Sequence, residues 1–272
     1  MEQYNTASYL ASRVITDAYS TSFGLSIRLF TTDLRPHIYA IYGFVRIADE
    51  IVDTYRGSDA QDQLDSLESD TYQALTTGYS ANPIIQAYVV TARRFKIGKR
   101  LIKPFFASMR MDLSPQTYAQ KSYEAYIHGS AEVVGLMCLK VFLNDEAAYA
   151  KLETGAKRLG AAYQKVNFLR DIAADADGLG RWYFPFASYD HFDEATKQVI
   201  VNDIQADFDA AKPSIRQLPD SSRRAVLLSY RYYQSLLRKI RRTPAAKLKR
   251  SRIRLPDSQK LLLLTTVAVR GK

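Results

Sequence analysis

Two short acidic runs, each set in an apolar stretch, are the residues of this sequence best suited to chemistry. The first lies in IYAIYGFVRIADEIVD, residues 38–53, where Asp49 and Asp53 follow Arg46 at helical spacing. At about 100° per residue these three side chains share one stripe of a helix, and most of the remaining surface is apolar. A helix that is apolar nearly all round is buried, so the two carboxylates, with Glu50 beside them, require positive partners.

The second run repeats this form in GAAYQKVNFLRDIAAD, residues 160–175. Its polar stripe consists of Gln164, Asn167, Asp171 and Asp175. One D-x-x-x-D pair on a helix is usually a solvated face, but two such pairs in apolar helices indicate a shared site. Oxygen ligands without histidine or cysteine favour a hard cation, Mg²⁺ before Ca²⁺ where a phosphate shares the site. If the two helices face each other, four or five carboxylates converge, and that array needs several cations and an anion such as diphosphate.

Helical periodicity dominates the chain and positions both stripes. We predict helices over residues 4–20, 34–56, 59–77, 81–95, 98–110, 116–127, 129–143, 145–174, 192–212, 220–242 and 256–268. Asp33 and Pro36 fit the start of the second of these helices, and Gly57 fits its end. Almost no segment alternates apolar and polar residues as a strand would. The sequence therefore predicts an all-α protein in which residues 1–272 form a single domain.

The positive charge of the chain is concentrated near its C-terminus. The formal net charge is +10, and residues 238–254 hold nine basic residues and no acidic one, which leaves 29 basic against 28 acidic residues elsewhere. A segment of this kind suits an anionic membrane surface. It would also suit nucleic acid, with Tyr230, Tyr232 and Tyr233 as stacking platforms, but a nucleic-acid-binding protein leaves the two acidic stripes unexplained.

Composition excludes several other classes of protein. With 47% hydrophobic residues the chain is not intrinsically disordered, and one cysteine excludes an intramolecular disulfide framework and a thiolate zinc cluster. The N-terminus lacks the pattern of a signal peptide, and no apolar stretch approaches the roughly 20 residues of a membrane span. We expect a cytoplasmic protein, peripheral to the inner face of the plasma membrane, which is a monomer or a weak dimer and binds no nucleic acid.

The chemistry-bearing segments resemble those of the squalene and phytoene synthases. The similar segments are D-E-I-V-D (49–53), N-F-L-R-D-I-A-A-D (167–175), Y-S-T-S-F (19–23), Y-I-H-G-S-A-E-V-V-G (126–135) and G-R-W-Y-F-P (180–185). They occur in the family's order and cover roughly residues 5–255. His128 and Glu132 depart from the tyrosine and glycine that the family often has there. The resemblance implies an isoprenoid synthase fold with a central active-site cavity.

The resemblance also implies a role for individual residues. Asp49, Glu50, Asp53, Asn167, Asp171 and Asp175 would bind several Mg²⁺ ions, which Mn²⁺ could replace. Arg46 and Arg181 would hold diphosphate oxygens, Gln164 would line the same site, and Ser20 and Ser22 would help to close it. Tyr126 and Tyr233 would lie at the catalytic centre together with the four aspartates.

The reaction also needs an apolar cavity, because the carbocation left when diphosphate departs must be kept from water. The sequence can supply that wall with Phe23, Val133, Val134, Met137, Phe168, Tyr230, Tyr232 and Tyr233, although each of these is also a normal core residue. The small residues Gly129, Ser130, Ala131 and Gly135 could leave room for a prenyl chain or could permit close helix packing.

Within the family the pattern looks closest to bacterial phytoene synthases. This implies head-to-head condensation of two geranylgeranyl diphosphates to phytoene through a cyclopropyl diphosphate, in carotenoid biosynthesis and without NADPH. The alternative is a squalene or dehydrosqualene synthase that uses farnesyl diphosphate.

Overall fold

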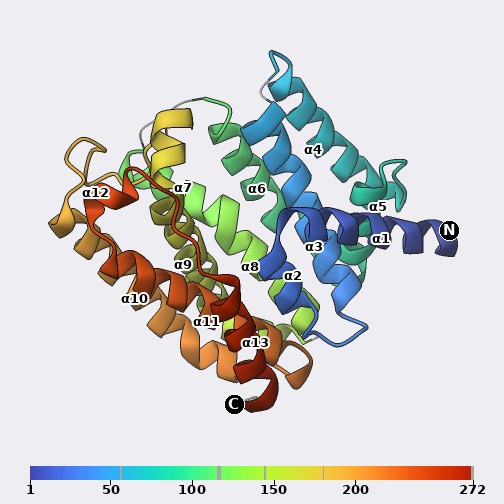
Figure 1. The fold of residues 1–272 in the computed structure, drawn as a ribbon. Helices are drawn as coiled ribbons and strands as arrows, with labels where there is room; N and C mark the ends of the chain where they lie inside the picture. The colour runs from blue at the N-terminus through green and yellow to red at the C-terminus, as the bar shows by residue number, and fades with distance from the viewer. Residues whose placement is uncertain (56, 115–117, 144, 180, 271–272) are drawn as a thin grey trace.

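The computed structural model describes residues 1–55, 57–114, 118–143, 145–179 and 181–270 (Figure 1). Its elements are α1 (Glu2–Tyr19), α2 (Thr21–Ile27), α3 (Arg35–Asp49), the π-helix η1 (Glu50–Tyr55), α4 (Ala60–Thr77), α5 (Pro83–Arg94), α6 (Lys99–Met111), α7 (Gln120–Ile127), the π-helix η2 (His128–Glu132), α8 (Val133–Phe142), α9 (Glu146–Leu179), α10 (Glu194–Arg216), α11 (Asp220–Arg242), α12 (Ala245–Leu248) and α13 (Asp257–Arg270). No strand forms within these residues, which confirms the predicted all-α class.

In the N-terminal part of the chain, two short segments differ from the predicted helices. The chain leaves the helical conformation at Ser20, whose side chain accepts a hydrogen bond from the amide of Phe23 and so caps α2, a helix the periodicity did not indicate. The predicted 34–56 helix changes to π geometry at Glu50. A π-helix forms i→i+5 hydrogen bonds and often marks a functional site. Asp49 and Asp53 therefore lie on either side of this change and do not share one straight α-helical stripe.

The helices bury two adjoining apolar clusters. One cluster draws mainly on α2 to α6 and α8, and the other on α7, α9, α10 and α11 together with the segment 182–192 and residues from the C-terminal run. Figure 1 shows the N-terminal helices on one side, the helices from α9 onward on the other, and α7 and α8 between them. The two acidic stripes thus come from opposite sides of a central helical layer.

A buried ion pair fixes the rotation of α9 against α10. Lys165, on α9, donates to Asp207 of α10 at 2.8 Å, and Arg158 reaches the same carboxylate at 2.9 Å. Breaking a buried pair on one side costs about 3–5 kcal/mol, so this contact strongly favours one orientation of α9. In that orientation Gln164 lines the cavity described below and Asn167 meets Tyr233 of α11.

Glycines allow η2 to approach its neighbours at backbone distance. A Cβ at Gly160 would lie 2.6 Å from the carbonyl oxygen of Ala131, and a Cβ at Gly129 would lie 2.2 Å from that of Pro104. Of the two roles considered for the small residues of this segment, close helix packing therefore applies to Gly129.

One continuous helical run, Gln120–Phe142, is long and apolar enough to qualify by length and composition as a membrane span. The prediction that no stretch approaches this length is therefore wrong for α7, η2 and α8 taken together. In the structure 44% of the qualifying window is buried, and η2 and α8 pack between α6 and α9. These contacts are those of a core helix.

We expect Gly160→Ala to lower the unfolding free energy by about 1–3 kcal/mol, despite alanine's better helix propensity, because the new methyl group meets backbone. Gly24→Ala is the matched control. Its Cβ would meet only the end of the Asp17 side chain, at 3.3 Å, so that variant should be as stable as the parent or more stable. Urea unfolding followed by circular dichroism measures both, and equal midpoints for the two variants would contradict the close packing.

Candidate active site

Arg181 brings the two acidic regions together. Its guanidinium is buried, with 3% of the side chain exposed, and its Nη1 lies 2.8 Å from Asp53 Oδ1 and 3.4 Å from Asp112 Oδ1. Its Nη2 donates to the carbonyl oxygen of Asp112, and its backbone amide donates to the carbonyl oxygen of Asp175 at 2.9 Å. Arg181, two residues beyond the end of α9, therefore connects η1, the end of α6 and the second acidic run.

Asp112 is a site residue that sequence reasoning missed. It is buried just after α6, and its Oδ2 accepts a hydrogen bond of 2.9 Å from the hydroxyl of Tyr126. The predicted catalytic Tyr126 is thus held by a carboxylate that also faces Arg181. Asp112 stands alone in M-D-L-S, without the paired spacing of the two stripes, so no local pattern distinguished it.

Two polar side chains of the second stripe, Asp171 and Asn167, form ion pairs or hydrogen bonds with other residues of the protein. Asp171 pairs with Arg170, its neighbour on α9, and with Arg252, whose Nε lies 2.7 Å from Asp171 Oδ1. The hydroxyl of Tyr233 donates to Asn167 Oδ1 at 3.4 Å, which places this predicted catalytic tyrosine beside the stripe. The basic segment 238–254 therefore includes the end of α11, α12 and a strap that crosses α9 and reaches the site.

The N-terminal side of the site is built around Arg46. Its guanidinium pairs with Glu50, lies 3.9 Å from Asp49 Oδ2, and stacks over the ring of Tyr19 with 4.3 Å to the centroid. The Nε of Arg46 is buried and forms no hydrogen bond. Ser20 serves as the cap of α2, and the side chain of Ser22 lies outside those that the structure describes.

The carboxylates are less buried and less gathered than predicted. The side chains of Asp49 and Asp53 are 32% and 41% exposed. Among the described residues no group of three or more acidic, histidine or cysteine side chains is close enough to hold a metal ion. The expected convergence of four or five carboxylates stays a prediction; in this structure Arg181 lies between Asp53 and Asp112, and Arg252 lies beside Asp171.

The arginines do not fully neutralise the acidic side chains of the site. Burial and the neighbouring Asp53 raise the pKa of Asp49 to about 8. Burial raises the pKa of Asp112 to about 7 against the opposing effect of Arg181, and burial with Asp171 raises that of Asp175 to about 7. Hard oxygen donors with raised pKa values fit divalent cations, whose binding would relieve the repulsion among these carboxylates.

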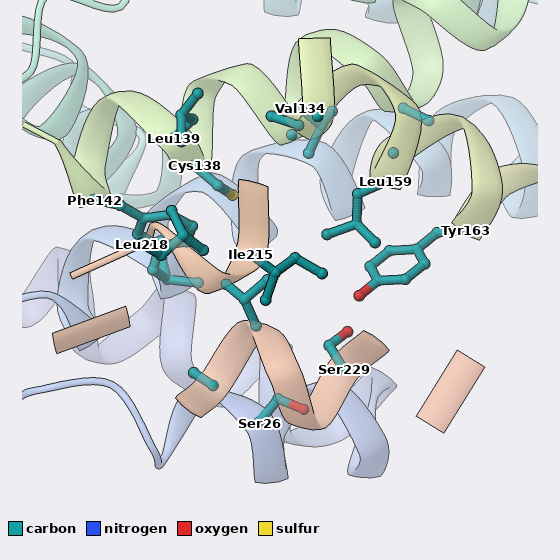
Figure 2. A pocket seen from close by; sticks show the side chains of 18 of the residues that line it. Ser26, Val134, Cys138, Leu139, Phe142, Leu159, Tyr163, Ile215, Leu218 and Ser229 are labelled. Atoms are coloured by element: carbon teal, nitrogen blue, oxygen red, sulfur yellow. The ribbon is translucent and has the colours of Figure 1, made fainter. Parts of the chain in front are cut away.

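An apolar cavity of about 230 Å³ lies between α2, α8, α9 and α11 (Figure 2). Phe23 and Val134 line it as predicted. Gln164, which was predicted for the polar site, also lines it, together with Tyr163, whose ring stacks on that of Tyr233 at 4.1 Å. Gln164 is also one turn from Asn167. The cavity thus begins beside the polar stripe and continues into apolar surroundings.

Several predicted wall residues lie elsewhere. Met137 is fully buried and accepts a contact of 3.5 Å from the hydroxyl of Tyr88, away from the cavity. Phe168 stacks on Tyr183 at 3.9 Å beside Tyr126, and Val133 belongs to the first core cluster. The reason is helical geometry: Val134, Cys138 and Phe142 follow at four-residue spacing along the edge of α8 that faces the cavity, whereas Val133 and Met137 lie on a stripe rotated by about 100° from it.

His128 and Glu132, the two departures from the family's usual residues, contact each other. His128 Nδ1 lies 2.8 Å from Glu132 Oε2 across the single turn of η2. The second substitution therefore supplies a polar partner for the first, and the local helix is kept.

Comparison with known proteins assigns the family. A sequence model of the squalene/phytoene synthases matches residues 16–259. The chain is 33% identical over 191 residues to a phytoene synthase of Arthrospira platensis, and 32% identical over 182 residues to a presqualene diphosphate synthase of Sinorhizobium fredii. These alignments cover 65% and 64% of this chain, and 61% of each relative. The chain belongs to the squalene/phytoene synthase family.

Solved structures agree on the fold. A dehydrosqualene synthase superposes with a TM-score of 0.83 at 21% identity, over 99% of this chain and 98% of its own. A squalene synthase of Alicyclobacillus acidocaldarius gives 0.76 at 23% identity, over 88% and 94%. The isoprenoid synthase fold implied by the sequence motifs is confirmed.

The raised pKa values make the metal-free protein less stable as pH rises. Asp49, Asp112 and Asp175 retain protons in the folded state at pH values where the unfolded chain, with pKa values near 3.8, has lost them. The unfolding free energy therefore falls as pH increases from about 4 to about 8.

Asp49→Asn should flatten this dependence and stabilise the metal-free protein at pH 8. Urea unfolding in EDTA measures the effect, with exposed Asp70→Asn as the control. An unchanged pH slope in Asp49→Asn would contradict this assignment.

Proposed function

We propose that this protein condenses two geranylgeranyl diphosphates head to head to phytoene through a cyclopropyl diphosphate. Each of the two steps breaks one carbon–oxygen bond and releases one diphosphate and one proton. The observation that carries the proposal is the direct junction between a polar, acidic and arginine-rich rim and an apolar cavity, at Gln164 and Asn167. A diphosphate and a hydrocarbon chain joined in one substrate need this combination.

The acidic residues are proposed to hold several Mg²⁺ ions, for which Mn²⁺ could substitute. Asp49, Glu50, Asp53, Asn167, Asp171 and Asp175 supply the oxygen donors. Bound Mg²⁺ supplies Lewis-acid stabilisation of the negative charge that develops on the leaving diphosphate. The raised pKa values of Asp49 and Asp175 support this proposal, because these carboxylates ionise fully only when positive charge is brought near them.

The arginines are proposed to orient the diphosphate. Arg46 offers a buried Nε that forms no hydrogen bond, and its planar guanidinium is supported from one side by the Tyr19 ring. Arg181 can exchange its contact with Asp53 for one with a diphosphate oxygen while Asp112 keeps it in place. A guanidinium presents a fixed fork of donors suited to phosphate oxygens.

The cavity is proposed to hold the prenyl chain and to exclude water from the carbocation. The stacked rings of Tyr163 and Tyr233 lie where the cavity meets the polar stripe, and their faces can stabilise a cation. Tyr126 is buried and donates a hydrogen bond to Asp112.

The second candidate is a squalene or dehydrosqualene synthase acting on farnesyl diphosphate. The relatives support this second candidate about as well as the first, since they include both a phytoene synthase and a presqualene diphosphate synthase at similar identity. Phytoene and dehydrosqualene form by proton loss, without NADPH, whereas squalene also requires reduction.

We also propose that the protein works in the cytoplasm as a monomer or weak dimer, against an anionic membrane that receives its apolar product. Leu261 and Leu262 of α13 are 60% and 65% exposed, and Arg241, Arg242 and Lys247 of the basic segment are exposed as well. Exposed leucines and exposed basic residues both suit the surface of an anionic bilayer.

A product assay tests the proposed reaction. The protein with Mg²⁺ should convert geranylgeranyl diphosphate to a C40 hydrocarbon without NADPH, as identified by mass spectrometry. Asp53→Asn and Asp175→Asn should each lower the rate by at least about 100-fold, since each removes a charge-stabilising group. Asp209→Asn, an exposed carboxylate of α10, is the control. A C30 product only would move the assignment to the farnesyl-using enzymes, and no product from either substrate would refute the function.

Liposome co-sedimentation tests the membrane proposal. Replacing Arg241 and Arg242 together by Glu should weaken binding to phosphatidylserine vesicles by roughly tenfold or more, since each basic residue near the surface contributes about 1 kcal/mol. The control with the same change in net charge is Lys121→Glu with Lys151→Glu, both exposed on other helices. Equal loss in both pairs, or binding insensitive to salt, would count against a specific docking face.

A further inference from the structure

The apolar cavity has two chemically different ends. Tyr163, Gln164 and Ser229 lie at the end beside the polar stripe, whereas Phe30, Phe142 and Leu218 contribute apolar side chains to the other end. Figure 2 shows Tyr163 and Phe142 at opposite sides of the cavity. If the proposed function is correct, a prenyl chain whose diphosphate lies at the stripe extends toward Phe30 and Phe142.

A pair of aromatic rings closes that far end. The rings of Phe30 and Phe142 stack with 5.2 Å between centroids and 23° between planes. Phe30 follows α2 and is 6% exposed, and Phe142 is the last residue of α8. The stop is therefore formed by two segments far apart in the sequence, each fixed at the end of a helix.

Space continues behind the Phe142 ring. A second hollow of about 390 Å³ is lined by Asp33, Leu34, Arg94, Phe95, Val141, Phe142 and Ser221. Phe142 lines both this hollow and the apolar cavity, so its side chain is the partition between them. Removing the ring would lengthen the cavity without disturbing the polar end.

We propose that Phe142, backed by Phe30, sets the longest prenyl chain that the protein accepts. The proposal rests on the proposed function of the site and makes Phe142 a specificity-determining residue. A chain one isoprene unit beyond the stop must displace the stacked ring, whereas a shorter chain leaves it in place. The close packing of protein interiors makes such a displacement costly.

Chain-length binding profiles test this proposal independently of turnover. Farnesol, geranylgeraniol and the C25 prenyl alcohol would be titrated against the full chain, with intrinsic tyrosine and tryptophan fluorescence as the readout. The unmodified protein should show a length beyond which affinity stops rising. Phe142→Ala should move that limit upward by one isoprene unit, with at least about a tenfold gain for the first excluded alcohol, because five more carbons are buried.

Two further variants keep the test decisive. Phe142→Leu is the variant to measure if Phe142→Ala does not fold. It retains a large apolar side chain, so it should shift the chain-length limit in the same direction by a smaller amount. Phe95→Leu is the matched control, because Phe95 lines the second hollow but not the cavity. An unchanged limit in folded Phe142→Ala or Phe142→Leu, or an equal shift in Phe95→Leu, would overturn the proposal.

The outcome separates this proposal from the proposed reaction. In product assays with C15, C20 and C25 diphosphates, Phe142→Ala should raise the share of the longer product at least about tenfold over that of the parent protein. If the parent forms no hydrocarbon from any diphosphate, the proposed reaction fails, and the alcohol-binding limit still decides the role of Phe142.

Discussion

The buried guanidinium of Arg181 is the contact on which the site depends. It holds Asp53 of η1 and Asp112 at the end of α6, while its backbone amide holds the last turns of α9 at Asp175. A buried charge of this kind is tolerated only when it is paired and hydrogen-bonded. The two halves of the helical assembly are therefore kept in register by the electrostatics of the site as well as by apolar packing.

The arginines also explain how so many acidic side chains coexist. Arg46 neutralises Glu50 and part of Asp49, and Arg252 reaches Asp171 from the strap that follows α12. The compensation is incomplete, since the pKa values of Asp49, Asp112 and Asp175 remain raised. Beside the apolar cavity the protein thus keeps carboxylates that ionise fully only when positive charge comes near them.

Packing separates the two environments. Close backbone contacts at Gly129 and Gly160 bring η2 against α6 and α9, and the buried Lys165–Asp207 pair fixes the rotation of α9. With α9 held in this way, its Gln164 edge meets both the polar stripe and the cavity. The ends of the cavity then differ in chemistry because one belongs to the helices that carry aspartates and the other to the apolar ends of α2 and α8.

The sequence by itself determined the all-α class, the family, and the identity of the acidic stripes, because helical periodicity and short motifs are local properties. It also identified Arg46, Arg181, Phe23, Val134 and Gln164 at positions that the structure brings to the site. Only the tertiary structure decided the contacts of Asp112 and Arg252, the place of Phe142 between two hollows, and the exclusion of Met137 from the cavity. Each of these depends on which face of one element meets another element distant in the sequence, and no local spacing encodes that relation. The π geometry after Asp49 likewise follows from packing, which overrides the α-helical period that the residues alone suggest.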